Sequence, residues 1–334
     1  MRNLYQKLPQ AFRARLKSLL QLTPLLLEEL AQVRWTLVSP GSVQRYFRLR
    51  RALHRIEKGL VAHPRRPGAG MDTVTLALDD LQDPEVASRL SKQDRSWSLA
   101  VLQQYAALLQ LDLNLSTALK AQAERLLLRL GSCVTTLTGE NPLHHMLIRD
   151  LPSARTDTAD LKNFFTSRHS VRSFTTQPLS DDTVFKALEF ARHSPSACNR
   201  QATGVVIVRD ATVRRQVLEL QGGATGYVDR MPTLLVLVGD RRGYPNYNER
   251  HTPYVDSALF GMNLIWGLLA HGVHSVCLNW SYTTPRKDRD LHRILKLDPR
   301  QRVAFVIAAG YAAGDALIPR STKRDAKDFI LGRF

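Results

Sequence analysis

Four short apolar runs rich in β-branched residues constrain the fold of this 334-residue chain most strongly. These runs are 203–208, 233–238, 273–278 and 303–309. Their length and composition are typical of buried strands. Segments with helical periodicity separate them, at about 180–192, 211–220, 254–271 and 285–296. From Leu151 onward the chain is therefore predicted to mix buried strands with helices.

Two of these predicted helices begin with recognisable start signals. Ser180 precedes Asp181 and Asp182, and a serine followed by acidic residues is typical of a helix N-cap. Thr284 precedes Pro285, and proline is favoured at the first helical position because its missing N–H would have no partner there.

Residues 1–150 show helical periodicity without strand-like runs. Pro24 interrupts the first leucine-rich stretch, and the prolines and glycines of 63–70 predict a loop. We divide the chain into a basic, mostly helical N-terminal region, 1–150, and a second domain, 151–334. The helices predicted in the first part are 10–33, 43–60 and a helical region at about 96–130.

Positive charge gathers at the N-terminus. The formal net charge is +17, and residues 1–70 alone hold 14 Lys or Arg against three Glu, a net +11. Such a segment attracts anionic lipid headgroups, acidic polymers or nucleic acid. Nucleic acid is the least favoured of these partners, because the segment carries neither an aromatic platform nor a known recognition motif.

The sequence also bears on the compartment and on metals. No apolar run reaches the roughly 20 residues of a membrane-spanning helix, and the basic N-terminus lacks a signal-peptide cleavage pattern. Cys133, Cys198 and Cys277 are too far apart to predict a disulfide framework or a zinc site. His144 and His145 have no companion ligands, so no metal is expected. We expect a cytoplasmic protein, with a peripheral position at the membrane as the alternative.

Two arginines, a histidine and three serines lie within 167–174. The guanidinium groups of Arg168 and Arg172 can donate paired, charge-assisted hydrogen bonds to an oxyanion, and the Ser170 hydroxyl adds a neutral donor. The composition indicates a phosphate site, and a solvated arginine-rich loop is the alternative.

A second polar segment, 194–201, separates a predicted helix from the first predicted strand. Asn199 and Gln201 carry amides that both donate and accept hydrogen bonds, as the imide edge of a flavin ring requires. Loops at strand ends are common ligand-binding positions. The alternative is a turn with capping residues, and Cys198 is either redox-active or a small packed residue.

The order and spacing of these two segments resemble the nitroreductase family. That family carries R-(H/S)-S-x-R-x-F, a helix, and then P-S-x-x-N-x-Q before a strand; this chain matches the first pattern at 168–174 and the second at 195–201. The resemblance covers about 160–334. It implies an α+β, nitroreductase-like fold with a central, mainly antiparallel sheet flanked by helices. The chain departs from the family at Ala202 and Thr203, where proline and an aromatic residue are usual.

The resemblance also implies which residues bind FMN. They fall into four groups: Arg168, His169, Ser170 and Arg172 at the phosphate and ribityl end; Pro195, Ser196, Asn199 and Gln201, of which the two amides lie nearer the ring; Asn279 and Trp280, through backbone amides near the reactive flavin nitrogen; and Lys323 and Arg324, returning to the phosphate.

By the same resemblance, the helix containing 254–264 forms the interface of an obligate homodimer with two flavins. The implied activity is an FMN-dependent oxidoreductase that takes electrons from NAD(P)H as co-substrate and passes them to a small-molecule acceptor. Because the cofactor carries the chemistry, no catalytic side chain is needed. The alternatives are a flavin-dependent oxidase or dehydrogenase of a biosynthetic intermediate, and a non-catalytic partner in a polysaccharide or membrane-associated assembly.

The segment 53–60, Leu-His-Arg-Ile-Glu-Lys-Gly-Leu, is similar to one in nitroreductase-like proteins associated with bacterial polysaccharide biosynthesis. This similarity suggests polysaccharide machinery as a partner of the basic N-terminal region. The alternative is that His54, Glu57 and Lys58 form a solvated helix face.

Overall fold

The computed structural model describes most of the chain after residue 40. The described residues are Pro9, Leu27, Leu30, 41–61, 67–112, 115–136, 156–224, 227–280, 284–319 and 323–333. Apart from Leu27 and Leu30, the predicted helix at 10–33 lies outside them, as does the His144–His145 pair. No described helix is long and apolar enough to cross a membrane.

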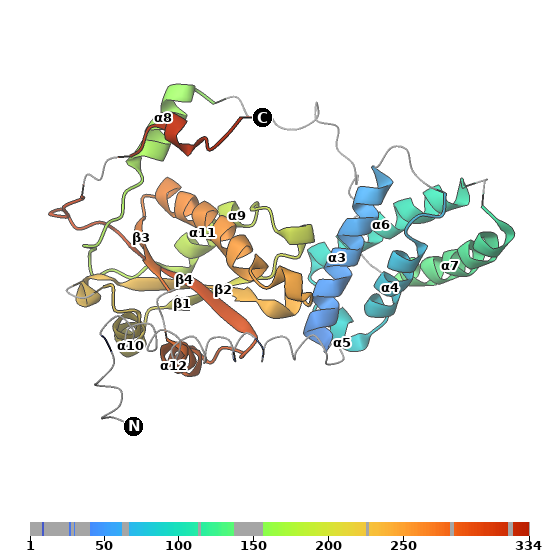
Figure 1. Ribbon diagram of the computed structural model, residues 1–334, viewed down its shortest axis with the longest axis horizontal. Coiled ribbons are helices and arrows are strands. Elements are labelled where there is room, and N and C mark those ends of the chain that lie inside the picture. Colours follow the sequence, from blue (N-terminus) through green and yellow to red (C-terminus); the bar gives the residue numbers. More distant parts are fainter. Residues whose placement is uncertain are drawn as a thin grey trace.

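The N-terminal part is a group of helices with its own apolar core (Figure 1). Its helices are α3 (Ser42–Leu60), α4 (Met71–Leu81), α5 (Pro84–Ala87), α6 (Lys92–Gln110) and α7 (Thr117–Thr136). In α3, Leu49, Leu53 and Ile56 recur at helical spacing and are buried, so one face packs inward and the arginines lie around it.

The structure of this part differs from the prediction in two respects. The helical region expected at 96–130 is two helices, because α6 ends at Gln110 and α7 begins at Thr117. Helix α4 was not predicted. It starts directly after Gly70, whose φ of 89° is the left-handed conformation that favours glycine.

The second part is built on a four-stranded sheet with the order β1-β2-β4-β3. Its strands are β1 (Thr203–Val208), β2 (Thr233–Asp240), β3 (His274–Asn279) and β4 (Gln301–Gly310). All three pairings are antiparallel, which confirms the predicted strands and the α+β class.

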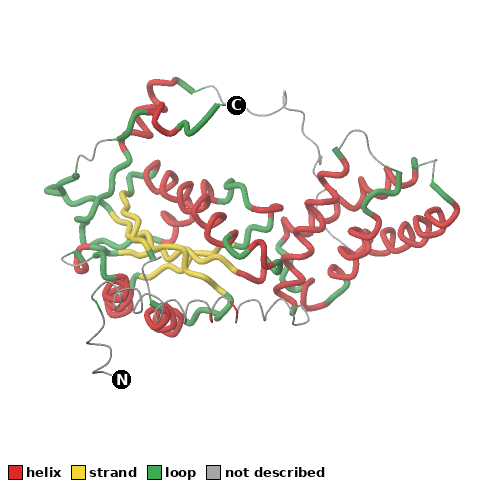
Figure 2. Tube along the Cα trace, viewed as in Figure 1, coloured by secondary structure: helices red, strands yellow, loops and turns green. Residues whose placement is uncertain are grey.

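Each face of the sheet is covered by a pair of helices (Figure 2). Helices α9 (Asp181–Ala191) and α11 (Thr252–Ala270) pack on the face that presents Leu235, Leu237 and Ile307. Helices α10 (Ala211–Gln221) and α12 (Pro285–Leu295) pack on the opposite face, over Val236 and Val306.

The predicted start signals of two of these helices are confirmed. The Ser180 side chain accepts a hydrogen bond from the backbone N–H of Thr183, and Thr284 accepts one from Lys287.

A further helix, α8 (Thr158–Ser167), precedes the first polar segment and was not predicted. Phe164 and Phe165 place their rings 5.4 and 4.5 Å from the ring of Trp266 on α11. The chain after α8 then runs along the sheet edge, where Ser170 forms an isolated parallel bridge with Ser275 of β3.

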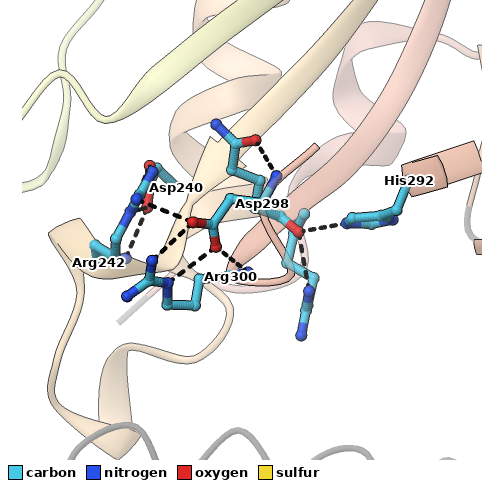
Figure 3. Close-up of polar contacts among 7 residues, drawn as sticks. Asp240, Arg242, His292, Asp298 and Arg300 are labelled. Atoms are coloured by element: carbon cyan, nitrogen blue, oxygen red, sulfur yellow. Dashed lines mark hydrogen bonds and ion pairs between the residues drawn. The ribbon is translucent and has the colours of Figure 1, made fainter. Parts of the chain in front are cut away.

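An ion-pair network fastens the end of β2 to the turn before β4 (Figure 3). Arg242 pairs with Asp240 and donates to Asp298 at 3.2 Å, and Arg300 donates to Asp298 at 2.7 and 2.9 Å. The network fixes the short 3₁₀ turn η5 (Arg241–Gly243). Gly243 within this turn packs against Ala202 and Phe47, so η5 supports the contact between α3 and the sheet.

Candidate functional site

The first polar segment runs along the outer edge of β3. The Val171 N–H donates to the Ser275 carbonyl at 3.2 Å, and the Thr175 N–H donates to that of Tyr311 at 2.8 Å. These bonds add the segment to the sheet as an edge and leave the side chains of Arg168 and Arg172 partly exposed. The arrangement keeps both guanidinium groups available to an anionic ligand.

Local hydrogen bonds hold the side chains of two of the four predicted residues, His169 and Arg172. The His169 Nδ1 donates to the Ser167 carbonyl at 3.0 Å, and Arg172 donates to that of Ser170 at 3.3 Å. Partial desolvation by neighbouring atoms raises the pKa of the Cys277 thiol, even though part of the residue is exposed. The positive charge of Arg168 acts in the opposite direction and lowers this pKa. Arg168 therefore lies within electrostatic range of β3.

The second polar segment is a tight loop between α9 and β1. Cys198, Asn199 and Gln201 have φ values of 53°, 51° and 53°, in the left-handed region that non-glycine residues seldom adopt. Within the loop, Gln201 Nε2 donates to Asn199 Oδ1 at 2.7 Å, and the Gln201 N–H donates to the Ser196 hydroxyl at 3.0 Å. Pro195 is exposed at its start. Strained conformations of this kind persist only where surrounding contacts enforce them.

Buried polar residues on one side of this loop supply such contacts. Asp256 of α11 accepts a hydrogen bond from the Ala197 N–H at 3.0 Å and another from the Tyr244 hydroxyl at 2.5 Å. Arg200 is buried, donates to Glu249 at 2.6 Å and lies over the Tyr244 ring. Burial and the bond donated to Asp256 both raise the pKa of the Tyr244 hydroxyl, which stays protonated as the donor.

A cavity of about 650 Å³ opens beside Asn199 and Gln201. Helices α3 and α6 form one wall, and α9 and α11 form the other. Its aromatic lining residues are Tyr46, Trp97, Phe185 and Phe260. The volume falls in the range of small-molecule pockets.

The two remaining predicted pairs lie elsewhere. Asn279 ends β3 with an exposed side chain, and its carbonyl accepts a bond from Gln221 at 3.0 Å. Trp280 is buried and donates to Asp288 at 2.9 Å, so its side chain belongs to the core. Lys323 and Arg324 are exposed, and Arg324 donates to the Asp328 carbonyl at 2.6 Å, a contact within its own segment.

The two polar segments lie at opposite corners of the sheet. Ser170 is beside Ser275, which pairs with Ala309 near the end of β4. Gln201 precedes Thr203, which pairs with Gly239, and Gly239 in turn pairs with Arg302 near the start of β4. Strand rise and spacing place these corners roughly 30 Å apart. A single chain therefore does not bring the two groups of predicted residues together.

Sequence reasoning missed the residues that hold the second loop. Asp256 binds the loop at Ala197, and Tyr244 in turn donates to Asp256. Arg50 of α3 donates to the loop at the Asn199 carbonyl. A buried polar position in an otherwise apolar helix was the available signal, since Asp256 interrupts the apolar run of α11. Among the residues that the structure describes, no cluster of three metal-ligating side chains occurs.

Comparison with known proteins gives one family match. Residues 165–225, which contain both polar segments, match the model of the nitroreductase family. An FMN reductase [NAD(P)H] of Bacillus subtilis is 29% identical over 75 residues, which cover 22% of this chain and 30% of that protein. An NADH dehydrogenase of Thermus thermophilus is 34% identical over 90 residues, covering 27% of this chain and 41% of that protein. The matches thus span less than half the length of these relatives.

Solved structures of similar shape overlap about half of the chain. A putative nitroreductase, ydfN, of Bacillus subtilis has 18% identity and a TM-score of 0.46, with 52% of this chain and 99% of that chain covered. An FMN-dependent nitroreductase of Clostridium difficile has 16% identity and a TM-score of 0.44, with 51% and 98% covered. The family assignment therefore rests on the sequence match and applies to residues 165–225, which carry the signature of the nitroreductase family.

Proposed function

We propose that the protein is an FMN-dependent oxidoreductase of the nitroreductase type, which transfers electrons from NAD(P)H through flavin to a small-molecule acceptor. The observation that carries this proposal is the match of residues 165–225, because that stretch contains both polar segments in the family's order. The two curated relatives, named for FMN reductase and NADH dehydrogenase activity, support the same reaction class.

The donor groups present fit FMN. Arg168 and Arg172 offer guanidinium groups, and Ser170 a hydroxyl, on one exposed edge of the sheet, a set suited to a phosphate dianion. Asn199 and Gln201 offer amides held in a rigid loop, suited to the carbonyl and imide groups of a flavin ring.

In this proposal the protein binds and orients its ligands. FMN supplies hydride and electron transfer when bound, so the chain needs no general acid or base of its own. The phosphate and ribityl end is held by Arg168, His169, Ser170 and Arg172. Lys323 and Arg324, from the C-terminal segment, also contact the phosphate. The cavity beside Asn199 gives a nicotinamide or an acceptor space next to the ring.

We propose that the complete site forms between two copies of the chain. The proposed phosphate-binding segment, 167–174, and the proposed ring-binding loop, 194–201, lie at opposite corners of one sheet, so a second copy is needed to bring one of each together. Helix α11 offers a surface for this contact, because Val255, Leu259 and Met262 recur at spacings of four and three and are 55%, 44% and 37% exposed.

Absorbance of the purified protein tests the function directly. We expect a yellow protein that releases FMN on denaturation and is bleached by NADH or NADPH without oxygen. Arg168→Ala should weaken FMN binding about tenfold or more, because it removes a charge-assisted contact to phosphate. Arg215→Ala is the matched control, since Arg215 of α10 forms an exposed pair with Asp229 and does not line the cavity.

Other results would redirect or reject the proposal. Bound FMN that neither nicotinamide reduces would favour oxidation of a biosynthetic intermediate. A colourless protein that takes up no added FMN would reject the flavin enzyme in either direction.

We also propose a division at residue 150 and a link of the N-terminal region to polysaccharide machinery at an anionic membrane surface. The separate apolar core of α3 to α7 supports the division, and the similarity of 53–60 supports the link. In α3, Glu57 pairs with His54 and accepts a bond from Trp97, so part of that segment stabilises the helices. Low-salt binding to phosphatidylserine vesicles, absent with phosphatidylcholine, would support the membrane contact; equal failure with both would reject it.

A further inference from the structure

We propose that Arg50 of α3 is a positioning residue for the ring-binding loop, and that the N-terminal helices brace this loop through it. The inference rests on the proposed function in one respect, since it takes Asn199 and Gln201 as contacts of the flavin ring. It assigns a role in that site to the part of the chain outside the family match.

Arg50 connects the N-terminal helices to the loop directly. Its Nε donates to the Asn199 carbonyl at 3.3 Å, and its Nη1 donates to the Asp94 carboxylate of α6. Arg50 is 8% exposed and Asp94 is 6% exposed, so both charges are removed from water. The Trp97 ring lies 5.1 Å from the guanidinium carbon.

Asp94 is itself fixed, which fixes the orientation of Arg50. Its carboxylate accepts bonds from the Ser91 N–H at 3.1 Å and the Ser91 hydroxyl at 2.8 Å, as part of the capping box that begins α6. The Tyr46 hydroxyl of α3 donates to the same carboxylate at 3.2 Å. A planar guanidinium held on an anchored carboxylate presents its remaining N–H groups in a set direction.

The loop requires support at the point where Arg50 contacts it. Asn199 has a left-handed φ, and residues on both sides, Cys198 and Gln201, share that unfavourable conformation. Asp256 holds the loop at Ala197, and Arg50 holds it at Asn199. Loss of the second contact should let the loop relax, which would move the Asn199 and Gln201 amides away from the positions where they meet the ring.

Substitutions of Arg50 can separate positioning from folding. Arg50→Lys keeps a positive charge opposite Asp94, but a single ammonium group does not reproduce a fork that donates to both the carboxylate and the loop carbonyl. Arg50→Gln removes the charge as well. The matched control is Arg48→Gln, because Arg48 lies on the same helix and pairs with a buried carboxylate, Asp80, on the side away from the loop.

The expected result is a change in flavin binding that does not follow stability. Both Arg50 variants of the full-length protein should raise the Kd for FMN about tenfold and shift the visible absorbance and circular dichroism of the bound flavin. Arg50→Lys should do so with a near-wild-type unfolding temperature, whereas Arg48→Gln should lower the unfolding temperature and leave flavin Kd and spectrum unchanged. Wild-type flavin Kd and spectra in both Arg50 variants, or equal changes in Arg48→Gln, would overturn the inference.

Hydrogen exchange in flavin-free protein keeps this test independent of the enzyme proposal. The N–H groups of Asn199 and Gln201 donate to the carbonyl and hydroxyl of Ser196, at 2.9 and 3.0 Å, and should be protected in the wild type. We expect about tenfold faster exchange there in Arg50→Lys and no change in Arg48→Gln. If the wild type binds no FMN, the proposed function fails, while unchanged exchange in the Arg50 variants would reject the brace alone.

Discussion

Single carboxylates hold together parts of this protein that are far apart in the sequence. Asp94 joins α6 to α3, Asp256 joins α11 to the loop before β1, and Asp298 joins the turn before β4 to Arg242. Each accepts at least two hydrogen bonds from side-chain or backbone donors. Each of these joints therefore depends on one side chain.

Asp298 should make part of the folding stability dependent on acid. Hydrogen bonds from Arg300 are the main cause that lowers its pKa to about 2, below the ordinary value near 4. A carboxylate with a depressed folded-state pKa stabilises the fold above about pH 4, and this contribution is lost as pH falls toward 2. Urea unfolding midpoints measured from pH 6 to pH 2.5 should thus fall less steeply in Asp298→Asn than in the wild type.

The control for this prediction is Asp229→Asn, whose partner Arg215 and carboxylate are both exposed. It should follow the wild-type profile, because exposed ion pairs contribute little to stability. An Asp298→Asn profile parallel to that of the wild type would contradict the prediction.

At this scale the sequence shows residue types but not their partners. Asn199 and Gln201 stand out because two amides precede a strand, and the loop position predicted for them agrees with the structure. Their supports do not stand out, since Arg50 lies 149 residues before Asn199 and Asp256 lies 59 residues after Ala197. Contacts at such separations depend on tertiary packing, which spacing along a single sequence does not encode.

At the scale of elements, the close contact of α9 with α11 underlies the site. A Cβ placed on Gly267 of α11 would lie 2.5 Å from the carbonyl oxygen of Ala187 in α9. The helices can approach this closely only because residue 267 has no side chain. Since the loop 194–201 follows α9 and is held by Asp256 of α11, the separation of these helices determines where the loop lies.

Gly267→Ala should destabilise the protein by about 1–3 kcal/mol, because the added methyl group meets backbone that cannot move aside without displacing α9. Gly131→Ala is the matched helical control: nothing lies within 4 Å of its added Cβ, so it should stabilise by about 1 kcal/mol through helix propensity. Chemical denaturation of both variants measures the two changes, and effects of the same sign would refute the packing argument.

The strands were predictable from their apolar runs, whereas α4 was missed although it buries Met71, Val74 and Leu78 at helical spacing. The four strands agree with their predicted ranges to within two residues at each end because their apolar runs are continuous. Helix α8 has no buried residue, and its apolar residues Leu161, Phe164 and Phe165 span little more than one turn, which is too short to reveal a helical period. The break between α6 and α7 was missed because leucines continue through 108–115 and conceal it.

At the scale of the whole molecule, the exposed stripe on α11 governs the proposed assembly. This stripe consists of Val255, Leu259 and Met262. It lies on the side of α11 opposite to Leu264 and Leu268, which are buried against the sheet. Apolar side chains at helical spacing that remain this exposed are typical of an interface. The same helix carries Asp256, so an interface on α11 would also lie near the loop 194–201 that Asp256 holds.

Leu259→Glu should raise the dimer dissociation constant about tenfold or more, because it places a charge in the centre of the apolar stripe. Analytical ultracentrifugation over a concentration series measures the change. Leu128→Glu on α7 is the control, since that leucine is 77% exposed and outside the stripe, and it should leave the assembly unaltered. A monomeric wild type at high concentration would rule out this dimer.

The separation of the two polar segments on one sheet has a consequence for inheritance. In the proposed dimer, a chain defective at Arg168 and a chain defective at Asn199 would combine into a particle with one doubly damaged pocket and one intact pocket. Two alleles that are each inactive alone would then complement one another in the same cell, whereas two alleles damaged in the same segment would not.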